Sequence, residues 1–338
     1  MRIFITDCEG PITKNDNAFE LCSSFIPGGD LLFRTLSRYD DYLALEGKMR
    51  DYEAGFTLRL VMPFLLAYGL DAQKMFRFSF ERLTLMPRAI EAIRAIRGLM
   101  PLFIISTSYQ PYLKALAGLV GLPSDCIVCT RISVENIRLD ENMLKRLREI
   151  AKWIISLGEV EEFDFETINR LNEVFFKEFL KKPLDQIMKS VHPIGSRGKK
   201  VALREIAKRT GSTLEEVIYV GDSITDCEAL REVRLSGGLA IAFNPNRYAL
   251  QEAEVVCLSE DTSPLVVFGY LFFKGGKEEV IKAVMNWNEE YLIKRGVPSE
   301  WLPKGEVGLI ERENLEFWTF RSESFRKKVR GVKIGELG

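Results

Sequence analysis

The chain has 338 residues, of which 46% are hydrophobic and 28% are charged, and its net charge at neutral pH is −1. These values predict a soluble globular protein that is long enough for two domains. The balanced charge gives no electrostatic reason to expect a nucleic acid or an anionic membrane as a partner. The apolar runs are too short to span a bilayer and no signal peptide is evident, so we expect a cytoplasmic protein.

Histidine and cysteine content argues against two classes of site. The one histidine, His192, precedes a proline and favours a loop position, so we exclude a Ser/His/Asp hydrolase. Six cysteines are scattered, and only Cys126 and Cys129 form a Cys-x-x-Cys pair, with no second pair at zinc-ligand spacing. A zinc site or a redox dithiol is the alternative, but we expect reduced thiols in or beside a buried strand.

The first informative stretch lies at the N-terminus. A short apolar run, residues 3–5, leads into Asp7, and Glu9 follows two residues later, before Gly10 and Pro11 interrupt the strand. Short apolar runs that end in turn residues are typical of buried strands, and ligands of open α/β sheets bind beside the carboxyl ends of such strands. We therefore expect two carboxylates at the rim of a sheet, although an ordinary turn after a strand would produce the same stretch.

Residues 15–85 are predicted to form a helical insertion, because apolar side chains recur at helical spacing and no strand alternation is evident. Asn17 is the expected N-cap of its first helix. An amphipathic helix then begins near Pro87, and a buried strand is expected at residues 102–105, ending in Ser106 and Thr107.

The middle of the chain repeats this pattern. A helix at residues 111–120 leads to a strand region at residues 126–134, and a second helical insertion is predicted over residues 137–194. A flexible link then leads into a helix that begins with the adjacent lysines Lys199 and Lys200.

A second pair of carboxylates follows the apolar run at residues 217–220. Asp222 and Asp226 lie four residues apart at the end of this predicted strand, so both could converge with Asp7 on one hard cation. Mg²⁺ favours a few carboxylate oxygens together with water and phosphate oxygens. The last strands of the sheet are expected at residues 237–243 and 255–258, and we expect the core to end near residue 270.

The remainder, residues 271–338, is predicted to be a C-terminal extension. Its end, residues 317–338, mixes aromatic with basic side chains. This composition could dock on a protein partner, but we expect a solvated tail.

In their order, these motifs resemble those of the haloacid dehalogenase (HAD) superfamily. Its members carry hhhhDxDGT on the first strand and GDxxxD on a later one. The first motif is Asp7-Cys8-Glu9-Gly10-Pro11 here, with Glu and Pro in place of Asp and Thr, whereas Gly221 to Asp226 matches the later motif unchanged. Ser106 matches the hydroxyl of the second motif, with Thr107 as the alternative. Lys199 matches the lysine of the third, with Lys200 left open.

The resemblance implies an α/β fold with a HAD-like (Rossmannoid) parallel sheet core and helical cap insertions. The core would comprise residues 1–14, 86–136 and 195–270, and the insertions would be residues 15–85 and 137–194. It also implies a Mg²⁺-dependent phosphohydrolase, a phosphatase of small phosphorylated metabolites that forms an aspartyl-phosphate intermediate.

Each candidate residue has a role under this resemblance. Asp7 would be the nucleophile and Glu9 the general acid and base. Mg²⁺ would be held by the side chains of Asp7, Asp222 and Asp226 and by the backbone carbonyl of Glu9. Ser106 and Lys199 would bind the remaining phosphate oxygens.

The opening stretch from Asp7 to Ala18 also looks like an archaeal HAD-like group. Some of its members are identified as subunit R of an energy-converting membrane hydrogenase. A second hypothesis is therefore an accessory or interaction subunit with weak or no catalysis. The complete set of acidic side chains favours the enzyme, because a degenerate scaffold would be expected to lose some of them.

Overall fold

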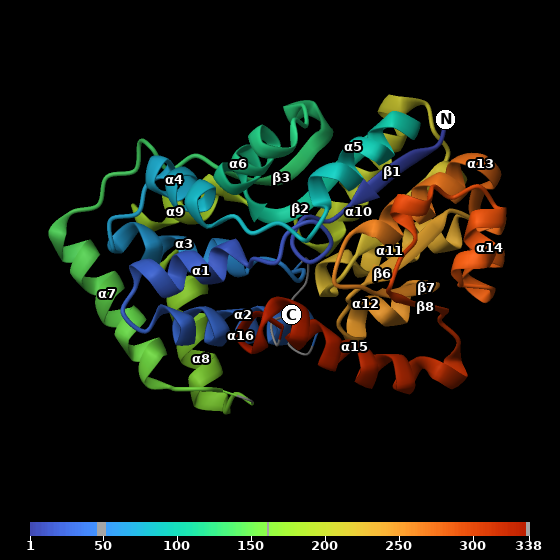
Figure 1. Ribbon diagram of the computed structural model, residues 1–338. Coiled ribbons are helices and arrows are strands. Elements are labelled where there is room, and N and C mark those ends of the chain that lie inside the picture. Colours follow the sequence, from blue (N-terminus) through green and yellow to red (C-terminus); the bar gives the residue numbers. More distant parts are fainter. Residues whose placement is uncertain (46–51, 161, 336–338) are drawn as a thin grey trace.

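The computed structural model of the protein describes residues 1–45, 52–160 and 162–335. In Figure 1, a sheet with helices on both faces lies beside a second body that consists of helices. Within the described residues, no helix has both the length and the apolar composition that crossing a lipid bilayer requires.

Eight strands in the described residues form one sheet, in the order β4-β3-β2-β1-β5-β6-β7-β8. The inner strands pair in parallel, and the edge strands β4 and β8 pair antiparallel with their neighbours. Their bounds are β1 (Ile3–Thr6), β2 (Leu102–Tyr109), β3 (Ile127–Ile132), β4 (Val191–His192), β5 (Val217–Gly221), β6 (Leu239–Phe243), β7 (Val255–Leu258) and β8 (Glu306–Leu309). The predicted α/β class with a largely parallel sheet is confirmed.

Both faces of the sheet are covered, which is why its central strands are continuously apolar. Side chains alternate between the faces. Phe4 packs with the helices α5 (Ala89–Leu99), α6 (Gln110–Val120) and α13 (Ser263–Met285). Ile3 and Ile5 pack on the opposite face with α10 (Ser196–Thr210), α11 (Cys227–Leu235) and α12 (Arg247–Glu252).

The helical body is built from both insertions, which share one hydrophobic core. The rings of Tyr39 and Phe64, from the first insertion, lie 5.9 and 6.3 Å from the ring of Phe175, in the second. Its helices are α1 (Asn17–Phe25), α2 (Gly29–Leu45), α3 (Thr57–Ala67), α4 (Ala72–Arg82), α7 (Glu141–Ser156), α8 (Phe165–Glu173) and α9 (Leu184–Ser190). Two segments that are far apart in the chain thus form one body at the carboxyl edge of the sheet (Figure 1).

Two local predictions are wrong in their bounds. The N-cap of α1 is Asp16, whose Oδ1 accepts a hydrogen bond of 2.9 Å from the backbone N–H of Phe19, and Asn17 is the first helical residue. Strand β2 continues to Tyr109 instead of ending at residue 105, with an irregular register between Ser106 and Tyr109. Cys129 lies in β3 and is buried, as expected of a cysteine packed as a small apolar residue.

The end of the chain differs more from the prediction. The sheet continues past residue 270, because β8 pairs with β7. Helix α14 (Glu289–Lys294) precedes β8, and α15 (Leu315–Arg330) and α16 (Val332–Gly335) follow it. The expected solvated tail is wrong, because α15 packs on α12 and buries Ser322 and Arg326. Helix α16 reaches the helical body, where Lys333 pairs with Asp30 of α2 at 3.2 Å.

We predict that the core shared by the two insertions contributes strongly to stability. Phe175→Ala should lower the free energy of unfolding by about 3–5 kcal/mol, because a fully buried ring leaves a cavity among residues of both insertions. Phe165→Ala, a matched change in the same insertion at a side chain that is 80% exposed, should change it by less than about 0.5 kcal/mol. Chemical denaturation measures both, and equal losses would contradict a shared core.

Candidate active site

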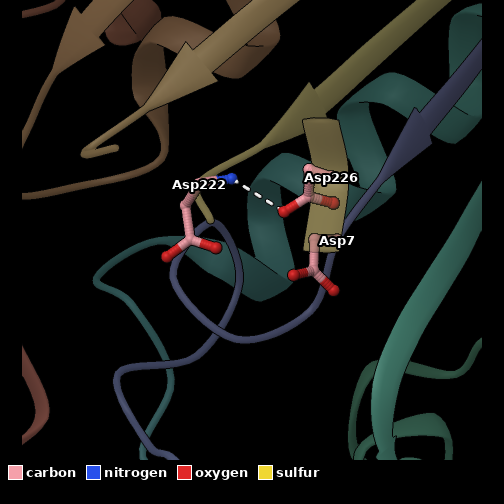
Figure 2. A group of neighbouring side chains, drawn as sticks. All are labelled: Asp7, Asp222 and Asp226. Carbon is pink, nitrogen blue, oxygen red and sulfur yellow. Dashed lines mark hydrogen bonds between the residues drawn. The ribbon is translucent and has the colours of Figure 1, made fainter. Parts of the chain in front are cut away.

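Three buried carboxylates meet at the carboxyl ends of β1 and β5. These strands are neighbours, and the backbone N–H of Asp7 donates to the carbonyl of Val220 at 2.8 Å. Strand β1 also pairs with β2 on its other side, so the order of the strands reverses at the point where open α/β sheets bind ligands. A carboxylate oxygen of each of Asp7, Asp222 and Asp226 lies within 4.8 Å of the others (Figure 2).

Two glycines allow this close approach. Gly10 has a φ of +105°, and a Cβ there would lie 2.4 Å from Oδ2 of Asp222. A Cβ on Gly221 would lie 2.4 Å from the Cβ of Asp226. Any side chain at either position would displace one of the carboxylates, so both motifs depend on glycine.

The ammonium group of Lys199 is fully buried between two of the carboxylates. Its Nζ lies 2.9 Å from Oδ2 of Asp7 and 2.8 Å from Oδ1 of Asp226. Burial opposes the charge of Lys199, but Asp226 and Asp7 outweigh burial and raise its pKa above the ordinary value. The lysine therefore stays charged and links the first strand motif to the later one.

Asp226 is saturated with hydrogen bonds. Its Oδ1 accepts from Lys199 and, at 2.8 Å, from the hydroxyl of Tyr219. Its Oδ2 accepts from the backbone N–H groups of Asp222, at 3.1 Å, and Ser223, at 3.2 Å; the bond from Asp222 is dashed in Figure 2. Asp226 thus holds the lysine and the turn after β5 in place.

Asp7 has fewer hydrogen-bond partners than Asp226. Its Oδ1 accepts from the backbone N–H of Cys8 at 2.7 Å, and its Oδ2 contacts Lys199. Burial raises the pKa of Asp7 to about 7, although Lys199 lowers it, and the negative charges of Asp226 and Asp222 add to the increase. A cation beside Asp7 would favour its ionised form.

The hydroxyls of residues 106–108 lie at the irregular end of β2 and line the same cavity as Asp7. Ser106 is buried, and its Oγ accepts from the backbone N–H of Ser108 at 3.2 Å, so its O–H can still donate. Thr107 instead donates its hydroxyl to the carbonyl of Ile194 at 3.0 Å. This geometry favours Ser106 over Thr107 as the hydroxyl that could donate a hydrogen bond to a ligand in the cavity.

Glu9 lies in the loop between β1 and α1 and lines the cavity. Its Oε1 accepts from the backbone N–H of Asn17, at 2.7 Å, at the start of α1. Burial raises the pKa of Glu9 well above its ordinary value, and the neighbouring charge of Asp16 adds to this. The raised pKa favours the protonated form of Glu9.

Two arginines of α15 belong to the site and were missed from the sequence. Arg326 Nη1 lies 2.5 Å from Oδ2 of Asp222, and Arg330 Nη1 lies 3.2 Å from the same oxygen. Arg330 also donates from Nη2 to the carbonyl of Asn15, at 2.5 Å, and from Nε to that of Lys14, at 3.2 Å. The two arginines are four residues apart, so they lie on one face of the helix. This spacing is visible in the sequence, but it does not indicate that Asp222 is the residue they contact.

The cavity above the carboxylates has a volume of about 110 Å³. It lies where the sheet, the helical body and α15 meet, and both bodies supply its lining. The lining residues are Asp7, Glu9, Asp16, Ala18, Phe33, Ser37, Asp40, Asp41, Gly55, Thr57, Leu58, Ser106, Thr107, Ser108, Asp222, Ser223, Ile224, Thr225, Arg326 and Arg330.

Comparison with solved structures gives a relative that matches along the whole chain. A structurally characterised gene product of Archaeoglobus fulgidus is 30% identical in sequence, with a TM-score of 0.86, and the match covers 100% of this chain and 99% of that one. The chain belongs to the same family as this archaeal protein. No family model matches the chain, and neither does any curated protein.

More distant solved structures share the fold of this chain. A phosphoserine phosphatase in a phospho-aspartyl intermediate analogue has a TM-score of 0.51 at 16% identity, covering 79% of this chain and 98% of that one. A substrate-bound phosphoserine phosphatase has a TM-score of 0.52 at 16% identity, covering 79% and 97%. At this identity the likeness concerns the fold, which is HAD-like, as the sequence motifs predicted.

The two candidate lysines of this HAD-like chain have different surroundings. Lys199 is fully buried between two acids, whereas Lys200 is 26% exposed and pairs with Glu228. We predict that Lys199→Met lowers the free energy of unfolding by about 3–5 kcal/mol, because it leaves buried carboxylates without their counter-ion. Lys200→Met, the matched control, should cost less than about 1 kcal/mol. Denaturant titration of both variants tests this, and a larger loss for Lys200→Met would contradict the assignment.

Proposed function

We propose that the protein is a Mg²⁺-dependent phosphohydrolase that cleaves phosphate monoesters through a phosphorylated Asp7. The observation that carries this proposal is a cavity lined by Asp7, Asp222 and Ser106, with the buried ammonium group of Lys199 2.9 Å from Oδ2 of Asp7. An anionic nucleophile, a cation-binding carboxylate pair and cationic and hydroxyl donors are what phosphoryl transfer requires.

The donor set fits a magnesium ion. Hard oxygen ligands, few in number and of high charge, are what this ion prefers. The side chains of Asp7 and Asp222 and the backbone carbonyl of Glu9 would hold it. Asp226, which the sequence motifs suggested as a further ligand, already accepts five hydrogen bonds with its two oxygens and would instead act by positioning Lys199. When bound, the ion offsets negative charge on the phosphate and on Asp7.

The residues divide the reaction between them. A carboxylate oxygen of Asp7 attacks phosphorus, and the bond between phosphorus and the ester oxygen breaks. The leaving oxygen takes the proton of Glu9, for which the raised pKa of Glu9 is suited. Glu9, now ionised, then takes a proton from a water molecule as that water attacks the phosphoryl group, which releases phosphate and restores Asp7.

Ser106 and Lys199 would bind the oxygens of the transferred phosphoryl group. The ammonium group of Lys199 reaches Asp7 at 2.9 Å, so it lies beside the atom that attacks. Donors that are fixed before the reaction stabilise developing charge without reorganisation. Asp226 holds the ammonium group of Lys199 in place, and the hydroxyl of Tyr219 in turn holds Asp226.

We expect the purified protein to hydrolyse a generic aryl phosphate in the presence of Mg²⁺. EDTA should abolish turnover, and excess Mg²⁺ should restore it. Asp7→Asn should lower kcat by at least roughly 1000-fold, because an amide oxygen is a poor nucleophile. Asp125→Asn, the same change at an exposed residue outside the cavity, should keep the parental rate. Parental turnover in EDTA or in the Asp7 variant would refute the proposal.

The accessory-subunit hypothesis stays a prediction. The described residues include the three buried acids of the proposed site, so the structure gives no support to a subunit without catalysis. The enzyme assay decides between the two hypotheses. Well-folded protein that hydrolyses no phosphate ester in Mg²⁺ would favour it.

A further inference from the structure

A second, larger hollow adjoins the active-site cavity and is rich in positive charge. Its volume is about 380 Å³, and it lies between α2 of the helical body and the helices α12 and α15 of the sheet body. Among the described lining residues are five cationic side chains, against the acids Asp41 and Glu323. The cationic residues are Arg34, Arg38, Arg247, Arg326 and Lys327.

The hollow and the active-site cavity share part of their walls. Ser37, Asp41 and Arg326 line both. Arg326 is almost fully buried at this shared wall and contacts Asp222 from it. The hollow, at about 380 Å³, lies within the range of about 300–1,000 Å³ that is common for small-molecule sites, whereas the active-site cavity, at about 110 Å³, is smaller. A ligand with its phosphate beside Asp7 would therefore extend into the basic hollow.

The positive charges come from three separate elements, which argues against a chance stripe on one solvated helix. Arg34, Arg38 and Asp41 follow one face of α2, three or four residues apart. Arg247 begins α12 and lines the same hollow, and its guanidinium lies 4.8 Å from the ring centre of Tyr248. Helix α15 supplies Arg326 and Lys327.

We propose that the substrate is a phosphate ester with a second anionic group, a carboxylate or a further phosphate, which binds in this basic hollow. This inference rests on the proposed phosphohydrolase function and narrows its substrate class. Guanidinium groups present paired N–H donors that match the oxygens of carboxylate and phosphate.

The experiment compares esters that differ by one anionic group. Turnover with Mg²⁺ is measured for glycerol phosphate against phosphoglycerate, and for a sugar monophosphate against the corresponding bisphosphate. We expect kcat/KM to be at least roughly tenfold higher for the doubly anionic member of at least one pair. Aryl phosphate, assayed in parallel, reports the phosphohydrolase activity itself.

Variants then assign any preference to the hollow. Arg38→Gln and Arg247→Gln should each lower the ratio of the two kcat/KM values by roughly 10-fold, through loss of a charged hydrogen-bond donor. Arg231→Gln, an exposed arginine that pairs with Glu252 and lines neither cavity, should leave the ratio unchanged.

The outcomes separate the two proposals. Hydrolysis of aryl phosphate without preference for a doubly anionic ester, or a preference that both arginine variants retain, would overturn this inference and leave the proposed function in place. If no ester is hydrolysed, the proposed function fails and this inference fails with it. A preference that falls in the arginine variants and not in Arg231→Gln supports it.

Discussion

The buried contact of Lys199 with Asp7 and Asp226 is the interaction on which the rest of the site depends. Three nearly inaccessible ionisable groups meet here, because Nζ of Lys199 lies 2.9 Å from Oδ2 of Asp7 and 2.8 Å from Oδ1 of Asp226. Each buried ion costs several kcal/mol in lost hydration, and that cost is offset only while the opposite charges and hydrogen bonds stay in place. Asp7 at the end of β1, the helix α10 and the turn after β5 are therefore fixed relative to one another before any ligand binds.

Segments far from the motifs complete the site around this contact. The two helical insertions fold as one body with a shared core and cover the carboxyl edge of the sheet. Helix α15 returns from the end of the chain, and Arg326 and Arg330 hold the same oxygen of Asp222, while Arg330 also binds the loop that carries Glu9. The cavity is thus closed by groups from the beginning, the middle and the end of the chain.

The sequence was sufficient for the parts that follow from local pattern. Apolar runs that end in Asp7 and in Gly221-Asp222 predicted two strands whose carboxylates could converge, and in the structure these strands are neighbours. The sequence was insufficient for contacts between residues that are far apart in the chain. Arg326 and Arg330 have the spacing of an ordinary basic helix, and their burial depends on Asp222, more than 100 residues away. Likewise, apolar residues at helical spacing predicted helices in both insertions, but periodicity carries no information about which helices meet, such as those that bring Tyr39 and Phe175 together.

A phosphorylated Asp7 is the central claim, and trapping it is the most direct test. The protein would be mixed with a phosphate ester and Mg²⁺, quenched in acid during turnover and digested, and the peptide that contains Asp7 examined by mass spectrometry. The account predicts that a fraction of this peptide carries one phosphoryl group, that hydroxylamine removes it as expected of an acyl phosphate, and that Asp7→Asn protein shows none. Turnover with an unmodified Asp7 peptide, or a phosphoryl group on another residue, would contradict the account.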